Sequence, residues 1–158
     1  MDVFTLLRDD HQTAESIFQK IERQFGEADT PERHELFRQL KAELDLHAKV
    51  EDLHVYRVFQ QAEATRDSAA QALEAHRKIK TLLDELATAR SYDFKWVSKF
   101  KELHHFVGQH VAAEEQEMFS KARQVLTPQE AEELGRMVQA AKRDISHGAP
   151  TAAGGTPE

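Results

Sequence analysis

Leu46-His47-Ala48-Lys49-Val50-Glu51-Asp52 places a histidine and a glutamate four positions apart, and the pair returns 63 residues later in His110-Val111-Ala112-Ala113-Glu114-Glu115. The apolar frame returns with it, because Leu40, Leu44, Val55 and Tyr56 correspond to Leu103, Val107, Met118 and Phe119. In an α-helix, positions i and i+4 lie about 40° apart on one face. Each His–Glu pair therefore shares its face with apolar residues, and the repeat predicts polar groups aimed into a core.

Each half of the repeat also has a histidine on an earlier helix, His11 before His47 and His76 before His110. A lone His-x-x-x-Glu is a common helical side-chain pair, whereas two copies of His…His-x-x-x-Glu at matched spacing indicate one shared site. Burying four imidazoles and two carboxylates without partners would be very costly. A pair of metal ions removes that cost. Imidazole with carboxylate suits iron better than structural zinc, which is usually mononuclear and tetrahedral.

The spacing of apolar residues predicts an all-α protein, an antiparallel four-helix up-and-down bundle with an additional short C-terminal helix. The helices are expected at about residues 2–25, 30–62, 67–90, 93–124 and 127–147. Thr30-Pro31 and Thr127-Pro128 are typical helix starts, and Glu130 completes a capping box. Residues 1–147 are expected to form one domain. Residues 148–158, rich in Gly, Ala, Pro and Thr, are expected to form a disordered tail.

Composition and charge argue against several classes of function. The chain has 158 residues, enough for one domain, and no cysteine, which excludes disulfides and thiolate sites. A formal charge of −7 argues against a nucleic-acid or anionic-membrane surface, and no apolar run reaches the roughly 20 residues that span a bilayer. Met1-Asp2-Val3-Phe4 lacks the build of a secretory signal, so a cytoplasmic protein is expected. The modest apolar stripe of the fifth helix fits a monomer or a weak homodimer.

From about Val3 to Lys121 the sequence resembles the hemerythrin-like HHE cation-binding proteins, of the H-HxxxE-H-HxxxE type. The resemblance is carried by Arg8-Asp9-Asp10-His11, Leu46 to Asp52, Glu74-Ala75-His76-Arg77 and His110 to Glu115. It implies a four-helix bundle holding two iron ions in a carboxylate-bridged and oxo- or hydroxo-bridged centre, with an open position for a small diatomic or peroxide ligand. The repeat and the resemblance together name the candidate metal ligands His11, His47, Glu51, His76, His110 and Glu114.

Two positions depart from the oxygen-carrying hemerythrins. Those proteins have a second histidine one turn after the third-helix ligand, and here that position is Lys80. Some hemerythrin-like relatives have a tyrosine nine residues after the second-helix histidine, and Tyr56 matches that position. A phenolate is a hard anionic donor suited to ferric iron, so Tyr56 is a seventh candidate ligand in the place that Lys80 leaves. An ideal helix puts Tyr56 about 180° from His47, so this role requires a bend or a helix end.

Nearby polar residues leave further alternatives open. Glu115 lies about 140° from His110 around an ideal helix and is expected at the surface. Glu15 is a candidate for a further ligand or for a hydrogen-bond acceptor that orients an imidazole. His54 either bonds its repeat mate Glu117 or lies exposed. The remaining histidines, all expected at the surface, are His34, His104, His105 and His147.

A di-iron pair with an open side supports more than one function. The favoured hypothesis is catalase-like decomposition of hydrogen peroxide or reduction of nitric oxide, because Lys80 and Tyr56 favour ferric iron over simple oxygen release. The alternative is a protein that binds, stores or senses oxygen or nitric oxide. A third hypothesis is iron storage or donation without turnover. The sequence leaves open whether the chain is a di-iron oxidoreductase or a binding protein.

Overall fold

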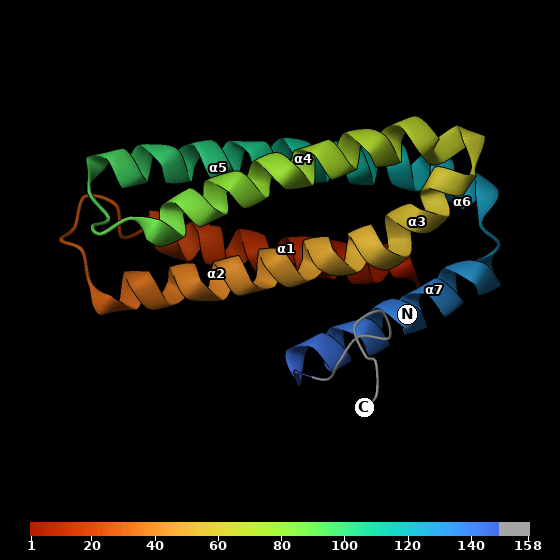
Figure 1. Cartoon of the computed structure of the whole chain (residues 1–158), viewed down its shortest axis with the longest axis horizontal. Coiled ribbons are helices and arrows are strands. Elements are labelled where there is room, and N and C mark those ends of the chain that lie inside the picture. The colour runs from red at the N-terminus through yellow and green to blue at the C-terminus, as the bar shows by residue number, and fades with distance from the viewer. Residues whose placement is uncertain (149–158) are drawn as a thin grey trace, which may run out of the picture.

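Four helical columns run side by side in alternating directions, and a further helix lies against one side of them (Figure 1). The computed structural model describes residues 1–148, and within them every element is helical. The elements are α1 (Val3–Glu22), α2 (Pro31–Val50), η1 (Glu51–Val55), α3 (Tyr56–Gln61), α4 (Glu63–Thr88), α5 (Phe94–Ala113), η2 (Glu114–Met118), α6 (Phe119–Val125) and α7 (Pro128–Ser146). In chain order, the four columns are α1, α2–η1–α3, α4 and α5–η2–α6. The all-α four-helix bundle with an extra C-terminal helix is confirmed. The tail expected from residue 148 lies, from residue 149 onward, outside the described residues.

Side-chain caps start the helices where the sequence predicts them. Thr30 accepts a hydrogen bond from the backbone N–H of Arg33 at 3.3 Å, and Asp93 accepts one from Trp96 at 3.1 Å. Thr127 and Glu130 form the expected capping box at the start of α7. Such caps satisfy backbone donors that a helix leaves free at its N-terminus, and each typically stabilises a helix by about 1 kcal/mol.

The third column begins earlier than the sequence suggests. The sequence predicts a start near Asp67, but α4 begins at Glu63, directly after the extended residue Ala62. The hydroxyl of Thr65 donates a hydrogen bond of 2.6 Å to the carbonyl of Phe59 and is fully buried, which ties the tight corner together. The corner therefore needs neither glycine nor proline, the residues that usually reveal a turn in a sequence.

Two π-helical turns, η1 and η2, interrupt the second and fourth columns at equivalent places in the repeat. A π-turn holds one more residue than an α-turn, so it rotates everything that follows it around the helix axis. Nine positions from His47 to Tyr56 then behave like eight, and the angle between them falls from about 180° to roughly 80°. Tyr56 is completely buried as a result. The bend that a ligand role for Tyr56 requires is therefore present.

The buried apolar residues form two clusters, one at each end of the bundle. One contains Phe4, Leu7, Tyr56, Phe59 and Phe119, and the other contains Ala14, Phe18, Phe37, Trp96 and Phe100. Along α1, His11 lies between Leu7 of the first cluster and Ala14 of the second. The polar residues of the repeat therefore lie in a layer between two apolar layers.

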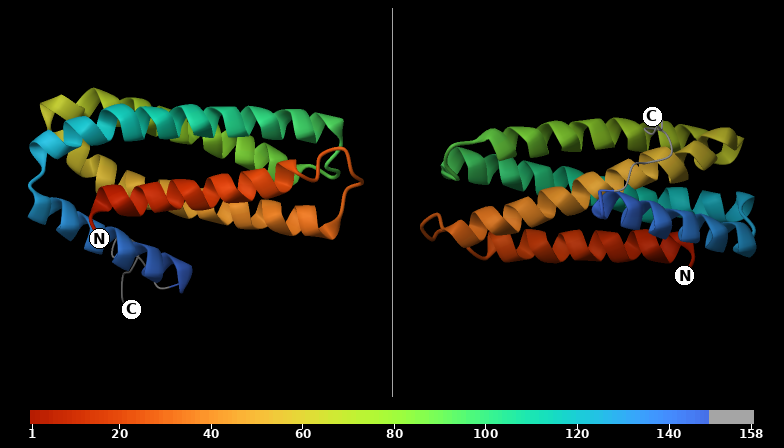
Figure 2. Two further views of the ribbon diagram at one scale, coloured as in Figure 1. Left: turned by 180° about the vertical axis from the view of Figure 1, so that it is seen from behind. Right: turned by 60° about the horizontal axis from the view of Figure 1, so that its bottom comes forward.

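Helix α7 packs on α1, α2 and η1 outside the four columns (Figure 2). It buries Ala131, Leu134 and Val138 against the apolar cluster that contains Phe4. Across residues 1–148, none of the helices combines the length and the apolar character needed to cross a membrane.

Candidate metal centre

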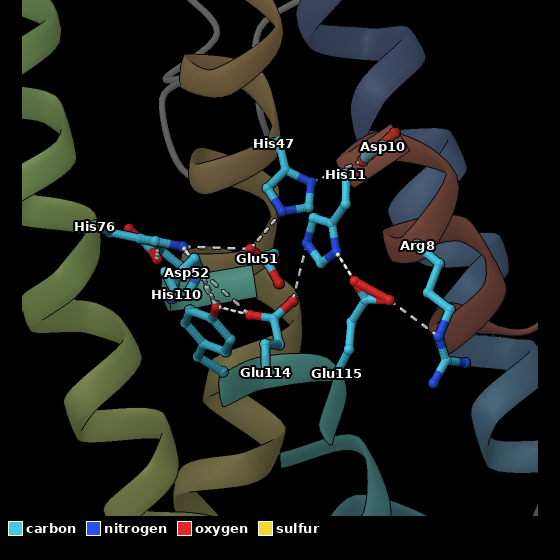
Figure 3. Close-up of polar contacts among 11 residues, drawn as sticks. Arg8, Asp10, His11, His47, Glu51, Asp52, His76, His110, Glu114 and Glu115 are labelled. Carbon is cyan, nitrogen blue, oxygen red and sulfur yellow. Dashed lines mark hydrogen bonds and ion pairs between the residues drawn. The ribbon is translucent and has the colours of Figure 1, made fainter. Parts of the chain in front are cut away.

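Six candidate ligands meet in the polar layer, and each comes from a different element. The elements and residues are α1 (His11), α2 (His47), η1 (Glu51), α4 (His76), α5 (His110) and η2 (Glu114). None of the six exposes more than 9% of its surface, and their side chains point toward one another from all four columns (Figure 3). The structure thus brings together all six residues that the repeat singled out.

Each glutamate lies between a histidine of its own column and a histidine of another column. Oε1 of Glu51 lies 2.7 Å from Nε2 of His47 and 3.3 Å from Nε2 of His76. The two oxygens of Glu114 lie 3.4 Å from Nε2 of His11 and 3.5 Å from Nε2 of His110. Two groups of potential ligand atoms result, one with His11, His47, Glu51 and Glu114 and one with Glu51, His76 and His110. Glu51 belongs to both, which is the position of a bridging carboxylate.

Several polar atoms at the centre have no hydrogen-bond partner within residues 1–148. They are Nε2 of His11, Nε2 of His47, both oxygens of Glu51 and Oε1 of Glu114, all buried; the close nitrogen–oxygen approaches among them lack the alignment of a hydrogen bond. A buried polar atom left without a partner costs about 1–3 kcal/mol of stability. Five such atoms in one place therefore indicate a site for a bound group, since they would destabilise an ordinary core. Imidazole nitrogen and carboxylate oxygen are both donors to iron and related divalent metals. The donor set therefore fits a pair of metal cations.

Carboxylates behind the imidazoles fix which ring nitrogen faces the centre. Nδ1 of His47 lies 2.8 Å from Asp10, and Nδ1 of His76 lies 2.7 Å from Asp52. Nδ1 of His11 lies 3.1 Å from Glu115. A carboxylate that accepts the Nδ1–H of an imidazole holds the ring in place and leaves Nε2 free as a metal donor. Three of the four histidines are oriented in this way.

The expectation that Glu115 lies at the surface is wrong, because its side chain turns inward to His11 and exposes only 28% of its surface. η2 begins at Glu114, so the ideal-helix angle from His110 does not apply there. Asp10 and Asp52 are also partners of histidines, a role that the sequence analysis did not assign to them. Each of these acids is the immediate neighbour of a candidate ligand in the sequence, and that adjacency was the available signal.

The carboxylate contacts cross between the two halves of the repeat. His11 belongs to the first half but is held by Glu115 of the second, whereas His76 of the second half is held by Asp52 of the first. Asp52 and Glu115 are themselves equivalent positions of the repeat, 63 residues apart. The centre therefore has an approximate two-fold arrangement in which each half orients a histidine of the other.

Tyr56 lies on one side of this arrangement. Its hydroxyl oxygen is 3.3 Å from Nε2 of His76 and 3.5 Å from Nε2 of His110, and it donates a hydrogen bond to Glu114. Lys80, at the position of the missing histidine, is exposed and lies 3.5 Å from Asp84. The structure places the Tyr56 oxygen, rather than any atom of Lys80, beside the His76 and His110 imidazoles.

The buried position of these groups perturbs their proton affinities. Burial and the neighbouring Glu51 charge raise the pKa of Glu114 to about 7, and burial lowers the pKa of His110 to about 3. Burial and the charges of Glu51 and Glu114 hold the pKa of Tyr56 well above its ordinary value. Opposed shifts within one cluster are typical of functional sites. A bound cation would reverse the direction for Tyr56, because positive charge favours the phenolate.

A small, partly open cavity lies beside the imidazoles. Its volume is about 30 Å³, and its lining includes the four histidines together with Ala14, Leu44, Ile79 and Val107. A space of this size holds a ligand of about two non-hydrogen atoms. A wider groove of about 300 Å³ runs between α4 and α5 and reaches His110 and Glu114 from the outside.

Glu15 and His54 lie away from the centre. Glu15 is exposed and bonds Nε2 of His104 at 2.8 Å, so the expectation that it is a ligand or orients a site imidazole is wrong. His54 is partly buried in η1, and its repeat mate Glu117 pairs with Lys121 at 2.9 Å instead.

The remaining histidines are better packed than expected. His104 stacks on Phe18 with ring centroids 4.3 Å apart and bonds Glu22 through Nδ1 at 2.5 Å. His34 stacks on Tyr92 at 3.8 Å. Both are therefore partly buried rather than freely solvated, whereas His105 and His147 are exposed as expected.

A helical bundle that gathers four histidines and two glutamates in a buried layer defines a protein that binds metal cations. A model of the family described as the Hemerythrin HHE cation binding domain matches residues 2–122, and the chain belongs to this family. The crystal structure of a hemerythrin HHE cation binding domain-containing protein from Mycobacterium kansasii is similar, with a TM-score of 0.81 and 24% identity. The match covers 94% of this chain and 89% of that one, and at this identity it establishes the fold. No curated protein sequence matches the chain.

Proposed function

We propose that the centre holds two iron ions and that the protein decomposes hydrogen peroxide to oxygen and water. The observation that carries this proposal is the placement of Glu51 and Glu114, each between imidazoles of two different columns. Carboxylates in such positions bridge two metal ions in other helical bundles. Iron is favoured over zinc because the donors are too many for one tetrahedral ion and include no thiolate.

A pair of iron ions supplies redox chemistry that amino-acid side chains lack. The protein's own residues orient and tune the pair. Asp10, Asp52 and Glu115 hold three imidazoles with Nε2 toward the centre. Tyr56 offers an anionic oxygen on the His76 and His110 side, which favours ferric iron and therefore disfavours simple release of bound oxygen. Glu114 accepts a hydrogen bond from the Tyr56 hydroxyl, which holds the phenol oxygen on the His76 and His110 side of the centre.

Oxygen evolution tests the proposal directly. Iron-loaded protein mixed with excess peroxide should release one oxygen molecule for every two peroxide molecules consumed, over many turnovers per chain. The Glu51→Gln variant given the same total iron is the control for free iron in solution. A single stoichiometric colour change without continued oxygen release would refute the peroxide reaction while leaving the iron centre itself in place.

Reversible binding of oxygen or nitric oxide is the second candidate function. The cavity of about 30 Å³ favours it, because aliphatic side chains line it beside the imidazoles and its size fits a diatomic ligand. The reduced protein exposed to oxygen should then give a stable spectrum that reverts under vacuum. Rapid oxidation that no longer reverts would count against storage or carriage and in favour of turnover.

A further inference from the structure

Helix α7 lies outside residues 2–122, the part of the chain that matches the family, yet it contacts the centre. Nζ of Lys142 on α7 forms an ion pair with Oδ1 of Asp10. The other oxygen of Asp10 accepts a hydrogen bond from Nδ1 of His47 at 2.8 Å, and Nε2 of His47 faces Glu51 at 2.7 Å. An unbroken line of polar contacts thus runs from α7 to the middle of the metal centre.

The register of α7 along α1 is set by close packing. A Cβ atom at Gly135 would lie 2.5 Å from the carbonyl oxygen of Met1, so only glycine lets α7 approach the N-terminal residues this closely. Leu134 and Val138 are buried on the same side of α7. Lys142 lies seven residues after Gly135, and Asp10 lies nine residues after Met1, so both are about two to two and a half helical turns beyond the close contact. The two helices run in the same direction here (Figure 2), so the close contact near their N-terminal ends places Lys142 beside Asp10 further along.

The ion pair is sheltered, and the carboxylate on the His76 side of the centre has no comparable pair with a lysine or arginine among the described residues. The side chains of Lys142 and Asp10 expose 24% and 14% of their surface. Asp52, which holds His76, exposes 38% and carries no lysine or arginine partner among the residues that the structure describes. On the His11 and His47 side, by contrast, both carboxylates carry a cation, because Arg8 bonds Glu115 at 3.2 Å.

We propose that Lys142 is a positioning residue of the metal centre, which fixes Asp10 and through it the orientation of the His47 imidazole. Asp10 is bonded through both oxygens, so it has one rotamer in which both contacts are made. Without Lys142 the carboxylate is free to turn toward water, and His47 loses its fixed orientation. The inference rests on the proposed iron centre but not on the reaction carried out there.

The first test needs no metal. Histidine ¹⁵N–¹H spectra of the iron-free full chain should show a changed His47 Nδ1 resonance in Lys142→Met and an unchanged His76 resonance. Arg143→Met is the matched control, because Arg143 is the exposed neighbour of Lys142 on the same helix and also loses one positive charge. Lys142→Arg should restore the wild-type spectrum. An unchanged His47 signal in Lys142→Met would overturn the proposal.

The second test measures the release of iron to a chelator. Removing a direct partner of a metal-bound histidine typically costs 10- to 100-fold in metal affinity, and Lys142 acts one contact further out. One of the two iron ions should therefore leave about 3- to 10-fold faster in Lys142→Met than in Arg143→Met. In an Asp10→Ala background the Lys142→Met substitution should add nothing. An equal effect in both backgrounds would mean that Lys142 acts by docking α7, and it would overturn the proposal, as would release at the wild-type rate. Continued release of oxygen from peroxide is measured separately and bears only on the reaction.

Discussion

The hydroxyl oxygen of Tyr56 lies 3.3 Å from Nε2 of His76, on the side of the centre where the chain has Lys80 in place of a histidine. The π-turn η1 produces this contact, because it rotates Tyr56 from the outside of the second column to the inside. At this position the two-fold arrangement is broken by one oxygen atom, since the equivalent residue of the repeat is Phe119.

Replacing Tyr56 with phenylalanine should abolish the phenolate-to-iron absorption band of the ferric protein while both iron ions remain. The chain has two tyrosines, and the other, Tyr92, stacks on Trp96 at the far end of the bundle. Tyr92→Phe is therefore a matched control that should keep the band. Visible absorption and resonance Raman spectra make the comparison, and a band that survives in Tyr56→Phe would rule out ligation by this residue.

Glu51→Gln should reduce the binding of both iron ions, because Glu51 belongs to both groups of ligand atoms. The iron content per chain should fall from about two to well below one, and iron should no longer raise the melting temperature. In the wild type, iron at 1,000 times its Kd should add about 4 kcal/mol to the free energy of unfolding. Glu117→Gln, an exposed position three residues beyond Glu114, is the control. Two firmly bound iron ions in Glu51→Gln would contradict a bridging role.

Ala14→Leu should block the approach of small ligands without removing iron. Ala14 is buried and lines the cavity of about 30 Å³, which the larger side chain would fill. Overpacking of this kind costs about 1–3 kcal/mol of stability, so the fold should survive. Azide binding to the ferric protein should weaken at least about tenfold, as seen by titration of the visible spectrum. Ala42→Leu, on the exposed side of α2, should leave azide binding unchanged; tight azide binding by Ala14→Leu would mean that ligands arrive elsewhere.

His104 should stabilise the protein in a pH-dependent way. Burial lowers its pKa, but hydrogen bonds to Glu15 and Glu22 outweigh this effect, so the pKa in the folded state is raised. A raised histidine pKa contributes stability that is complete below the unfolded value of about 6.5 and is lost as pH rises through the folded value. His104→Gln should therefore lose about 1 kcal/mol more at pH 6 than at pH 9, a small figure because the site is partly solvated. Urea unfolding of this variant and of His105→Gln, an exposed neighbour, checks the difference, which should be absent from the control.

The repeat made the four histidines and two glutamates of the centre predictable, because positions four apart in a helix share a face whatever the tertiary structure. Asp10, Asp52 and Glu115 were not predictable in their roles. Each reaches a histidine on another column, and such a contact depends on how the columns are rotated against one another. That rotation is set in part by η1 and η2, and no residue type marks a π-turn in the way that glycine or proline marks a loop. The early start of α4 at Glu63 escaped prediction for a related reason, since a buried threonine makes the corner.

The crossed contacts of Glu115 with His11 and of Asp52 with His76 make the two halves of the chain mutually dependent. An isolated N-terminal hairpin, for example, would contain His11 without the carboxylate that orients it and Asp52 without its histidine partner. Each half of the repeat therefore depends on the other for the orientation of one histidine. In sequence the repeat looks like two sites, but the crossed hydrogen bonds make it one.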